Sequence, residues 1–401
     1  MTDHPVTDHP VLRIPPPDFL AEPALQSVLA ALPRARLVGG CVRDAVIGRP
    51  VADIDLATPD QPEAVMTALA EAGLRAVPTG IDHGTVTAVS GHRGFEITTL
   101  RRDVETDGRH ARIAFTDDWR QDAARRDFTM NALSMRPNGA IHDYFGGIAD
   151  LQAGHVRFVG DPATRIAEDY LRILRFFRFH AYYGVGAPDP AALAAIAEGI
   201  HGLARLSVER VWSELKRILA APDPASCLQL MQELHVLRAV MPEATSPNRL
   251  VRLVAAGAPP DALLRLASLL DGDPAALALR LRLSGAERDR LVALTTAPVP
   301  PPNADDATLR RLLADVPACI LIGRLWLTGG DATLRERVSA LPAPVFPLHG
   351  RDLSAAGVPA GPAMGALLRD LRNWWLEGGC LADAAACRAE LRHRLAARAP
   401  T

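Results

Sequence analysis

The stretch LVGGCVRDAVIGRPVADIDLAT, residues 37–58, indicates how the first part of this 401-residue chain folds. Gly39 and Gly40 follow a short apolar run and precede a segment that can start a helix. Because glycine has no Cβ atom, its backbone N–H group approaches a ligand closely, and a helix N-terminus favours phosphate. Arg43 falls in the first turn of this helix and offers a planar pair of donors. The stretch therefore predicts a strand, a phosphate-binding turn and a short helix.

The same stretch ends in two aspartates that alternate with apolar residues. Asp53 and Asp55 flank Ile54, and this period of two predicts a second strand with both carboxylates on one face. Adjacent carboxylates repel each other unless a cation lies between them. Oxygen ligands of this kind suit Mg²⁺, which usually takes one or two carboxylates together with substrate phosphates and water. The combination predicts nucleotidyl transfer, although Asp-x-Asp alone is also typical of a solvated edge strand.

The motif GGCVRD followed by DID resembles the signature of the DNA polymerase β-like nucleotidyltransferases. The resemblance is to their class II branch, which holds bacterial CCA-adding tRNA nucleotidyltransferases and bacterial poly(A) polymerases. It implies an α/β N-terminal nucleotidyltransferase domain, with a small mixed sheet and helices. The C-terminal half is rich in leucine and alanine at helical spacing, so we expect an all-α region to follow.

Composition bounds the class of protein. The five cysteines are scattered and never form CxxC, which argues against a zinc site or a disulfide scaffold and fits a cytoplasmic protein. No apolar run approaches the roughly 18 residues of a membrane span, and no secretory signal pattern is visible. The net charge of −2 places any nucleic-acid-binding charge in local patches, where arginine dominates because Lys216 is the only lysine. The sequence gives no oligomeric state.

Two segments between the first motif and residue 120 bear on the site. FEITTL, residues 95–100, predicts a strand in which Glu96 is a candidate third metal-binding carboxylate; a solvent-facing glutamate is the alternative. Residues 101–119 are polar and too long for a tight turn, so we expect a mobile loop. The resemblance implies that this loop helps the active site to change between nucleotides.

The segment DAARRDFTMNA predicts a helix that starts at Asp122. It resembles the RRDFTxNA motif of the family, and the resemblance implies that Arg126 binds the nucleotide triphosphate. Without that context, two arginines beside an aspartate on a helix more often form salt bridges at the surface.

The segment RIAEDYLRILRFFRFH, residues 165–180, predicts one apolar helix carrying a row of charged residues. Aspartate accepts and arginine donates hydrogen bonds, so a positioned pair can match the Watson–Crick edge of a base. The segment resembles the EDxxR motif of class II CCA-adding enzymes, which implies that Asp169 and Arg172 pair with the incoming base. The resemblance also implicates Arg175 and Arg178 in nucleotide binding. An amphipathic helix with internal ion pairs is the alternative.

These patterns predict a division of the chain into five parts. The expected parts are a disordered tail (1–23), a catalytic head (24–160), a helical base-reading neck (161–225), a helical body (226–300) and a helical tRNA-binding tail (301–401).

The expected function is template-independent addition of CCA to tRNA 3′ ends from CTP and ATP, with release of pyrophosphate. Asp53 and Asp55 hold two Mg²⁺ ions in this scheme, and the helical half binds the acceptor and TΨC half of tRNA. A poly(A) polymerase and an enzyme restricted to CC or to A remain alternatives with the same chemistry. An inactive RNA-binding protein and an antibiotic nucleotidyltransferase are alternatives of other kinds.

Overall fold

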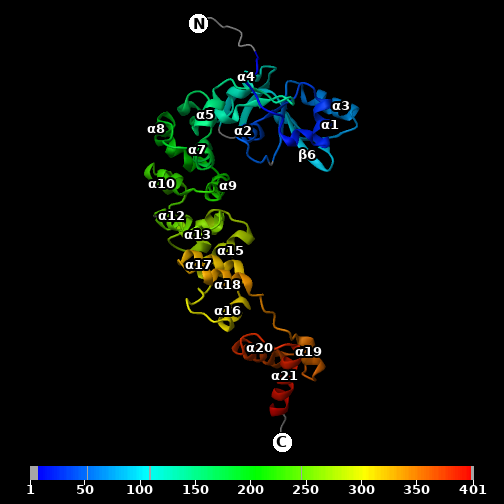
Figure 1. The fold of residues 1–401 in the computed structure, drawn as a ribbon, viewed down its shortest axis with the longest axis vertical. Coiled ribbons are helices and arrows are strands. Elements are labelled where there is room, and N and C mark those ends of the chain that lie inside the picture. Colours follow the sequence, from blue (N-terminus) through cyan, green and yellow to red (C-terminus); the bar gives the residue numbers. More distant parts are fainter. Residues whose placement is uncertain (1–7, 52, 108–109, 245, 399–401) are drawn as a thin grey trace. The chain divides into compact units, whose positions relative to one another are not determined.

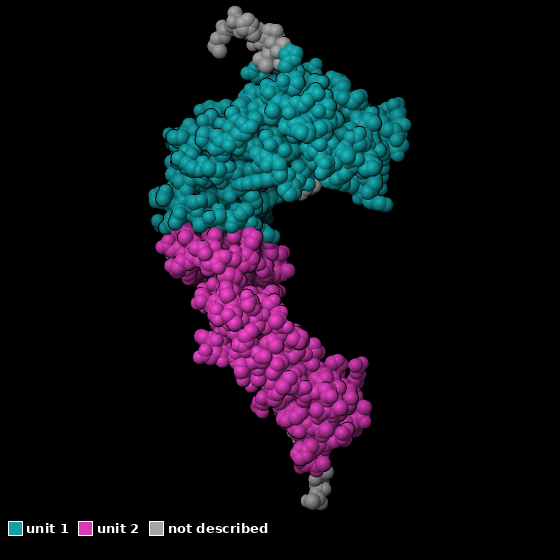
Figure 2. Space-filling model, in the orientation of Figure 1, with its two compact units in different colours: residues 1–242 teal, residues 243–401 magenta. Residues whose placement is uncertain are grey.

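The computed structural model of the protein describes residues 8–51, 53–107, 110–244 and 246–398 (Figure 1). The chain divides into two compact units, unit 1 (Met1–Pro242) and unit 2 (Glu243–Thr401), coloured separately in Figure 2. Unit 1 combines a mixed sheet with helices, and unit 2 is built of helices. The predicted fold class, an α/β N-terminal domain followed by an all-α region, is confirmed. The finer predicted divisions stay predictions.

Unit 1 contains an eight-stranded sheet with the strand order β1-β10-β9-β2-β3-β6-β5-β4. All neighbouring strands in it are antiparallel except β3 and β6, which run parallel. The strands are β1 (Leu12–Arg13), β2 (Arg36–Val38), β3 (Asp55–Thr58), β4 (Arg75–Gly80), β5 (Thr85–Ser90), β6 (Arg93–Thr99), β9 (Ser134–Met135) and β10 (Ala140–His142).

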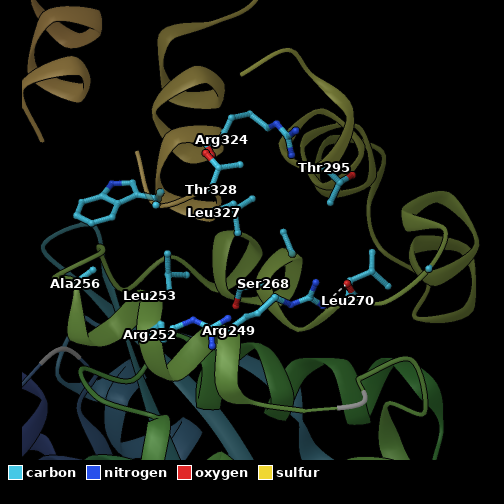
Figure 3. Close-up of a pocket in the computed structure, with 14 residues that line it drawn as sticks. Arg249, Arg252, Leu253, Ala256, Ser268, Leu270, Thr295, Arg324, Leu327 and Thr328 are labelled. Atoms are coloured by element: carbon cyan, nitrogen blue, oxygen red, sulfur yellow. Dashed lines mark hydrogen bonds between the residues drawn. The ribbon is translucent and has the colours of Figure 1, made fainter. Parts of the chain in front are cut away.

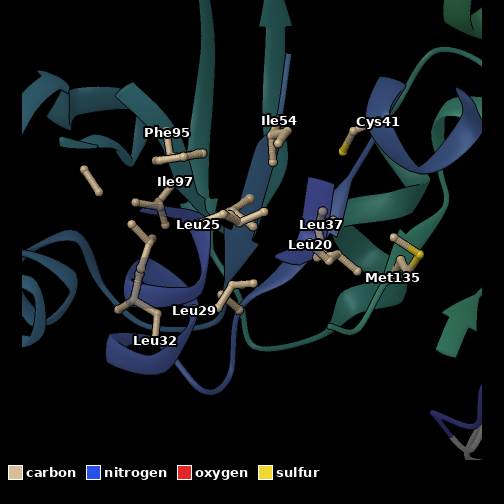
Figure 4. Packing of buried hydrophobic residues seen from close by; sticks show 14 of the residues in the cluster. Leu20, Leu25, Leu29, Leu32, Leu37, Cys41, Ile54, Phe95, Ile97 and Met135 are labelled. Carbon is tan, nitrogen blue, oxygen red and sulfur yellow. The ribbon is translucent and has the colours of Figure 1, made fainter. Parts of the chain in front are cut away.

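The core of this sheet lies under the first and third helices. α1 (Pro23–Ala31) and α3 (Pro62–Glu71) both pack against β5. Figure 4 shows Leu25 from α1 beside Phe95 and Ile97 from β6, and all three are fully or almost fully buried. Alternating residues of a strand point to opposite faces, so burial of Phe95 and Ile97 places Glu96 on the other face.

The segment that precedes α1 is held against unit 1. β1 pairs with β10, Leu20 is 2% exposed, and Asp8 forms an ion pair with the buried Arg36. The prediction of a disordered tail over residues 1–23 therefore does not hold from residue 8 onward, because one apolar anchor and one ion pair fix a segment whose composition is loop-like. Residues 1–7 lie outside the described part of the chain.

A β-hairpin occupies most of the predicted mobile loop over residues 101–119. β7 (Arg101–Asp107) pairs antiparallel with β8 (His110–Phe115) in a separate two-stranded sheet. Both segments carry β-branched or aromatic residues at alternate positions, which suits paired strands. The many charged residues obscure this pattern, which explains why the sequence suggested a loop.

Unit 2 contains the helices from α12 onward, and its buried apolar residues form separate clusters. One cluster lies among α16 (Asp306–Leu313), α17 (Ala318–Leu327) and α18 (Ala332–Ala340), and another among α19 (Gly350–Ala355), α20 (Pro362–Glu377) and α21 (Ala384–Arg398). Across the described residues of both units, no helix is long and apolar enough to cross a membrane.

Candidate active site

The glycine turn of the first motif adopts a conformation that requires glycine. Gly39 has φ 72° and ψ −128°, and α2 (Gly40–Val46) begins at the next residue. A Cβ atom on Gly39 would lie 3.2 Å from Nη1 of Arg126, closer than ordinary van der Waals contact. A glycine here therefore leaves room for the Arg126 guanidinium beside the start of α2.

Arg43 is buried and fixed in α2 by partners from distant parts of unit 1. Its side chain donates from Nη1 to Oδ1 of Asn131 at 2.8 Å, and its guanidinium lies 4.3 Å from the centroid of the Tyr183 ring. The neighbouring Asp44 carboxylate forms an ion pair with it at 2.9 Å. These contacts hold a cationic group close to the glycine turn; the role of Arg43 in binding phosphate stays a prediction.

The two aspartates of the second motif lie at the N-terminal end of β3, which pairs in parallel with β6. β3 begins at Asp55, so Asp53 precedes the strand instead of lying in it, and the predicted strand is shorter than expected. Asp55 is directly opposite Glu96 in the parallel register of β3 and β6. Burial raises the pKa of Asp55, and the negative charges of Glu96 and Asp53 raise it further, whereas Arg126 opposes the rise.

These acidic groups fit a divalent cation. Carboxylates that lie close together repel one another, and a cation between them removes this repulsion. Among the residues that the structure describes, no group of three or more His, Cys, Asp or Glu side chains is arranged to hold a metal ion. Two carboxylates with substrate phosphates and water are, however, a sufficient ligand set for Mg²⁺.

The predicted helix from Asp122 to residue 132 is interrupted. α4 (Trp119–Ala124) ends before the RRDFT motif, and a short 3₁₀ turn (Thr129–Asn131) follows an extended residue. Asp118 caps α4 by accepting from the Arg120 N–H at 2.8 Å, so the predicted start of the helix at Asp122 is wrong. The spacing of apolar residues stays helical even where one extended residue separates two helical turns, so the sequence pattern predicted a single helix.

Asp122 instead holds the two arginines of the motif. It accepts from Arg125 Nε at 2.9 Å and from Arg126 Nη2 at 3.2 Å. Burial alone would raise the pKa of Asp122, but the charges of Arg126 and Arg125 outweigh burial and lower it. Arg126 is therefore positioned by a carboxylate that stays ionised.

The predicted helix over residues 165–180 is broken at Asp169. α6 (Pro162–Glu168) ends there, Asp169 has extended backbone angles (φ −155°, ψ 106°), and α7 (Leu171–Tyr183) follows. Oδ1 of Asp169 accepts from the Leu171 N–H at 3.1 Å, as helix-capping aspartates do. One apolar period runs through both helices, so the sequence pattern alone does not reveal the break.

The two later arginines of α7 are held by buried carboxylates. Arg175 donates from Nε to Oδ2 of Asp127 at 2.7 Å, and Nη1 of Arg175 is 3.8 Å from Glu214. Arg178 forms an ion pair with Glu214, which comes from α9 (Val208–Leu219) and is 3% exposed. Burial lowers the pKa of Arg178 to about 10, although the Glu214 carboxylate opposes this.

A chain of hydrogen bonds from arginine side chains to backbone carbonyl oxygens joins the RRDFT motif to α7. Nη2 of Arg165 donates to the carbonyl oxygen of Arg126 at 2.7 Å, and Nη1 of Arg172 donates to the carbonyl oxygen of Arg165 at 2.6 Å. Glu168 forms ion pairs with both Arg165 and Arg172. We refer to this arrangement as the Arg126–Arg165–Arg172 chain.

A cavity of about 620 Å³ in unit 1 brings most of the predicted site together. The predicted residues that line it are Gly39, Gly40, Arg43, Asp55, Arg126, Asp169, Arg172 and Arg175. Asp53, Glu96 and Arg178 are not among the lining residues. Seven arginines and three aspartates line the cavity, so its charge is strongly positive and suits a triphosphate.

Sequence reasoning missed several residues that line this cavity. Arg101 is the first residue of β7. Asp127 is the third residue of the RRD triplet, in which the sequence indicated a binding role only for an arginine. Phe179 and Arg210 also line the cavity. No sequence pattern marked Arg210 as a site residue, because it occupies a polar position of an ordinary amphipathic helix far from the other motifs in the sequence. Asp127 pairs with Arg175 of α7, a residue of the other motif, so the sequence around Asp127 does not indicate its partner.

Unit 2 has a cavity of its own, of about 630 Å³, between α12 (Asn248–Ala255), α13 (Ala262–Leu269) and α17. Figure 3 shows Arg249 and Arg252 on one side of it and Arg324 on the other. Arg249 forms an ion pair with Asp271, and the buried Nε of Arg324 has no hydrogen-bond partner in the described part of the chain. Three guanidinium groups and one compensating carboxylate give this cavity a positive charge.

Comparisons with known proteins agree with this geometry. Residues 35–157 match a family model for the Poly A polymerase head domain, and residues 187–246 match one for a probable RNA and SrmB-binding site of polymerase A. The Mus musculus protein named CCA tRNA nucleotidyltransferase 1, mitochondrial, is 37% identical over 86% of this chain and 83% of its own length. A CCA-adding enzyme from Lacticaseibacillus paracasei is 35% identical over 90% of this chain and 93% of its own length.

A solved structure is also similar over nearly the whole chain. The crystal structure of the Bacillus stearothermophilus CCA-adding enzyme in complex with CTP has a TM-score of 0.75 and 28% sequence identity to this protein. The match covers 94% of this chain and 99% of the other.

Proposed function

Because this chain belongs to the class II family of CCA-adding tRNA nucleotidyltransferases, we propose that it adds CCA to the 3′ ends of tRNA from CTP and ATP. The observation that carries the proposal is the cavity of unit 1. It combines Asp55, a strongly cationic lining that includes Arg43 and Arg126, and the pair Asp169 and Arg172. A cavity with these three parts suits transfer of a nucleotide that is selected by the protein and not by a nucleic-acid template.

Members of this family use divalent metal ions, and we propose Mg²⁺ held by Asp53 and Asp55 with Glu96 beside them. Mg²⁺ would lower the pKa of the terminal 3′-hydroxyl of tRNA and stabilise the charge on the α-phosphate and on the pyrophosphate leaving group. The position of Asp55 opposite Glu96 supports this assignment: burial is the main cause of the raised pKa of Asp55, and the charges of Glu96 and Asp53 add to it.

The arginines of the cavity have separate roles in this proposal. Arg43 and Arg126, with the N–H groups of Gly39 and Gly40, bind the triphosphate. Asp169 and Arg172 read the base. Arg175 completes the positive wall, and Arg175 and Arg178 fix α7 through their carboxylate partners, so that Arg178 would act on the nucleotide from outside the lining. The fixed orientations of Arg43 and Arg126 support the assignment, since a preorganised donor loses less entropy on binding.

The cavity of unit 2 is the proposed contact for the tRNA backbone. Arg249, Arg252 and Arg324 line it, and guanidinium groups bind phosphate oxygens with paired donors. Duplex RNA is recognised mostly through its shape and its phosphates, which suits a cationic cavity on a helical unit. We also propose a cytoplasmic location, which the five unpaired cysteines support.

Incubation with Mg²⁺ and three tRNA transcripts, ending before CCA, after C and after CC, tests the proposal. CTP and ATP are supplied singly and together, and products are sized at single-nucleotide resolution. We expect all three transcripts to be extended to CCA and no further. A run of A residues would identify a poly(A) polymerase, and stopping at CC or extending only the last transcript would identify a restricted enzyme.

A matched pair of variants tests the metal assignment. Asp53→Ala should abolish incorporation because a carboxylate that holds the metal is lost, whereas Asp82→Ala removes an exposed carboxylate away from the cavity and should leave incorporation intact. Unchanged incorporation by Asp53→Ala would contradict the assignment. If the wild-type protein extends no transcript, the RNA-binding alternative becomes the better description.

A further inference from the structure

The base-reading aspartate has an ion-pair partner that the motifs do not contain. Nη2 of Arg210, in the first turns of α9, donates to Oδ2 of Asp169 at 2.7 Å. The other carboxylate oxygen, Oδ1, accepts from the Leu171 N–H at 3.1 Å. Both oxygens of Asp169 are thus fixed, one by the first residue of α7 and one by α9.

Arg210 belongs to the same cavity as the groups that would contact a nucleotide. Its side chain is 30% exposed, that of Asp169 is 21% exposed, and both residues line the cavity of unit 1. Arg172, by contrast, is bonded to the carbonyl oxygen of Arg165 and to Glu168. Arg210 is therefore the cationic group placed directly on the carboxylate that faces the base.

We propose that Arg210 is a positioning residue for base selection, which fixes the Asp169 carboxylate so that its remaining lone pairs accept from an incoming base. A carboxylate offers about four acceptor positions, and the two bonds described above use two of them. An exocyclic amino group, present on cytosine and adenine, donates to a remaining position. Uracil presents a carbonyl oxygen at the corresponding edge, and a fixed carboxylate repels it.

This inference rests on the proposed function and makes a statement of its own about selectivity. Without Arg210, the carboxylate rotates, so an amino-bearing base loses a preorganised acceptor, and a carbonyl-bearing base escapes part of the repulsion. The ratio of kcat/KM for CTP to that for UTP should therefore fall. Triphosphate binding and tRNA binding use other residues and should change little.

The test measures kcat/KM for CTP and for UTP on a tRNA that ends before CCA. Arg210→Ala should lower the CTP-to-UTP ratio about tenfold, the loss expected for one charge-assisted hydrogen bond. Arg210→Lys keeps the charge and should restore part of the ratio. Lys216→Ala removes an exposed cation from the same helix outside the cavity and should leave the ratio unchanged.

A double-mutant cycle separates positioning of Asp169 from a general effect on α9. In an Asp169→Ala background, Arg210→Ala should produce no further loss of the ratio, because the group that it positions is absent. An equal loss of kcat/KM for both nucleotides, or additive losses in the cycle, would overturn the inference. If Arg210→Ala does not fold, as judged by its melting temperature, the Arg210→Lys and Arg210→Gln variants decide the question by the same ratio.

The wild-type protein distinguishes failure of this inference from failure of the proposed function. No addition of CTP by the wild type overturns the proposed function and, with it, this inference. Addition by the wild type with an unchanged ratio in Arg210→Ala overturns the inference alone.

Discussion

Replacing Asp127 by asparagine should destabilise unit 1 strongly while leaving its packing volume unchanged. Oδ2 of Asp127 accepts from Nε of Arg175 at 2.7 Å, whereas Oδ1 accepts from the Phe128 N–H and from Asn131. An asparagine can keep its oxygen on the Oδ1 partners and turn its amide nitrogen toward Arg175. The substitution therefore removes the ion pair and leaves the other bonds in place.

The magnitude follows from the burial of the pair. Asp127 is 8% exposed, and loss of one partner from a buried ion pair costs about 3–5 kcal/mol. The Arg175 side chain keeps 31% exposure and has Glu214 at 3.8 Å, so we expect the lower end, about 3 kcal/mol. For a unit of this size, each kcal/mol shifts the melting temperature by about 2–4 °C, which gives a decrease of about 6–12 °C.

Differential scanning calorimetry at pH 7 measures this decrease. The pKa of Asp127 is lowered because the charge of Arg175 outweighs the effect of burial, so the carboxylate is fully ionised at this pH and its stabilisation is complete. The control is the double variant Asp127→Asn/Arg175→Gln, which leaves no unpaired charge and should be more stable than Asp127→Asn alone. A decrease below about 2 °C, or a double variant less stable than Asp127→Asn, would refute the reasoning.

Three further predictions concern other parts of the molecule. Gly39→Ala should raise the KM for both nucleotides because its Cβ atom crowds Arg126. Gly48→Ala, with a similar φ of 66° but open space around it, should cost only about 1 kcal/mol of stability. Steady-state kinetics and thermal melts compare the two variants, and equal KM values for them would contradict the explanation. Arg252→Ala should weaken tRNA binding and reduce the slope of log K, the tRNA association constant, against log salt concentration by about 0.7–1. Arg288→Ala, outside the cavity of unit 2, should leave the slope unchanged. Filter binding at several salt concentrations tests this, and identical slopes for Arg252→Ala and the wild type would exclude the phosphate contact. Asp8→Asn should lower the stability of unit 1 at pH 7 by about 1 kcal/mol. Burial raises the pKa of Asp8, but its bond to Arg36 and other contacts outweigh burial and lower the pKa to about 2. The side chain is 42% exposed, so solvent screening reduces the stabilisation. A carboxyl with a depressed pKa stabilises the fold above its unfolded pKa of 3.8 and loses this effect as pH falls toward 2, so melting curves of wild type and variant should converge between pH 4 and pH 2; a constant difference would exclude the carboxylate as its source.

The parts of the site that the sequence predicted well are those that depend on local spacing. The glycine turn before α2 and the alternation around Asp55 are set by neighbouring residues, and the structure has both. Glu96 lies opposite Asp55 in neighbouring strands, although the sequence predicted neither the pairing of these strands nor its register. Their roles in binding metal and nucleotide stay predictions.

The parts that the sequence did not predict depend on contacts between distant segments. A period of 3.6 residues runs through Asp169 without interruption, yet the chain leaves the helix there because the Asp169 side chain bonds to a backbone N–H and to Arg210. The pairing of Arg175 with Asp127 spans the two motifs and has no trace in either. Ion pairs between segments are selected by the tertiary arrangement, so a single sequence contains only their separate halves.

The Arg126–Arg165–Arg172 chain has a consequence for how one site accommodates a pyrimidine and a purine nucleotide. Two of its hydrogen bonds end on backbone carbonyl oxygens, which restricts the separation between Arg126 and Arg172, the residues proposed to bind the triphosphate and the base. CTP and ATP differ in the distance from the base edge to the phosphates, because a purine is the larger base. If this chain of bonds keeps its length with both nucleotides, groups outside it make the change from adding C to adding A.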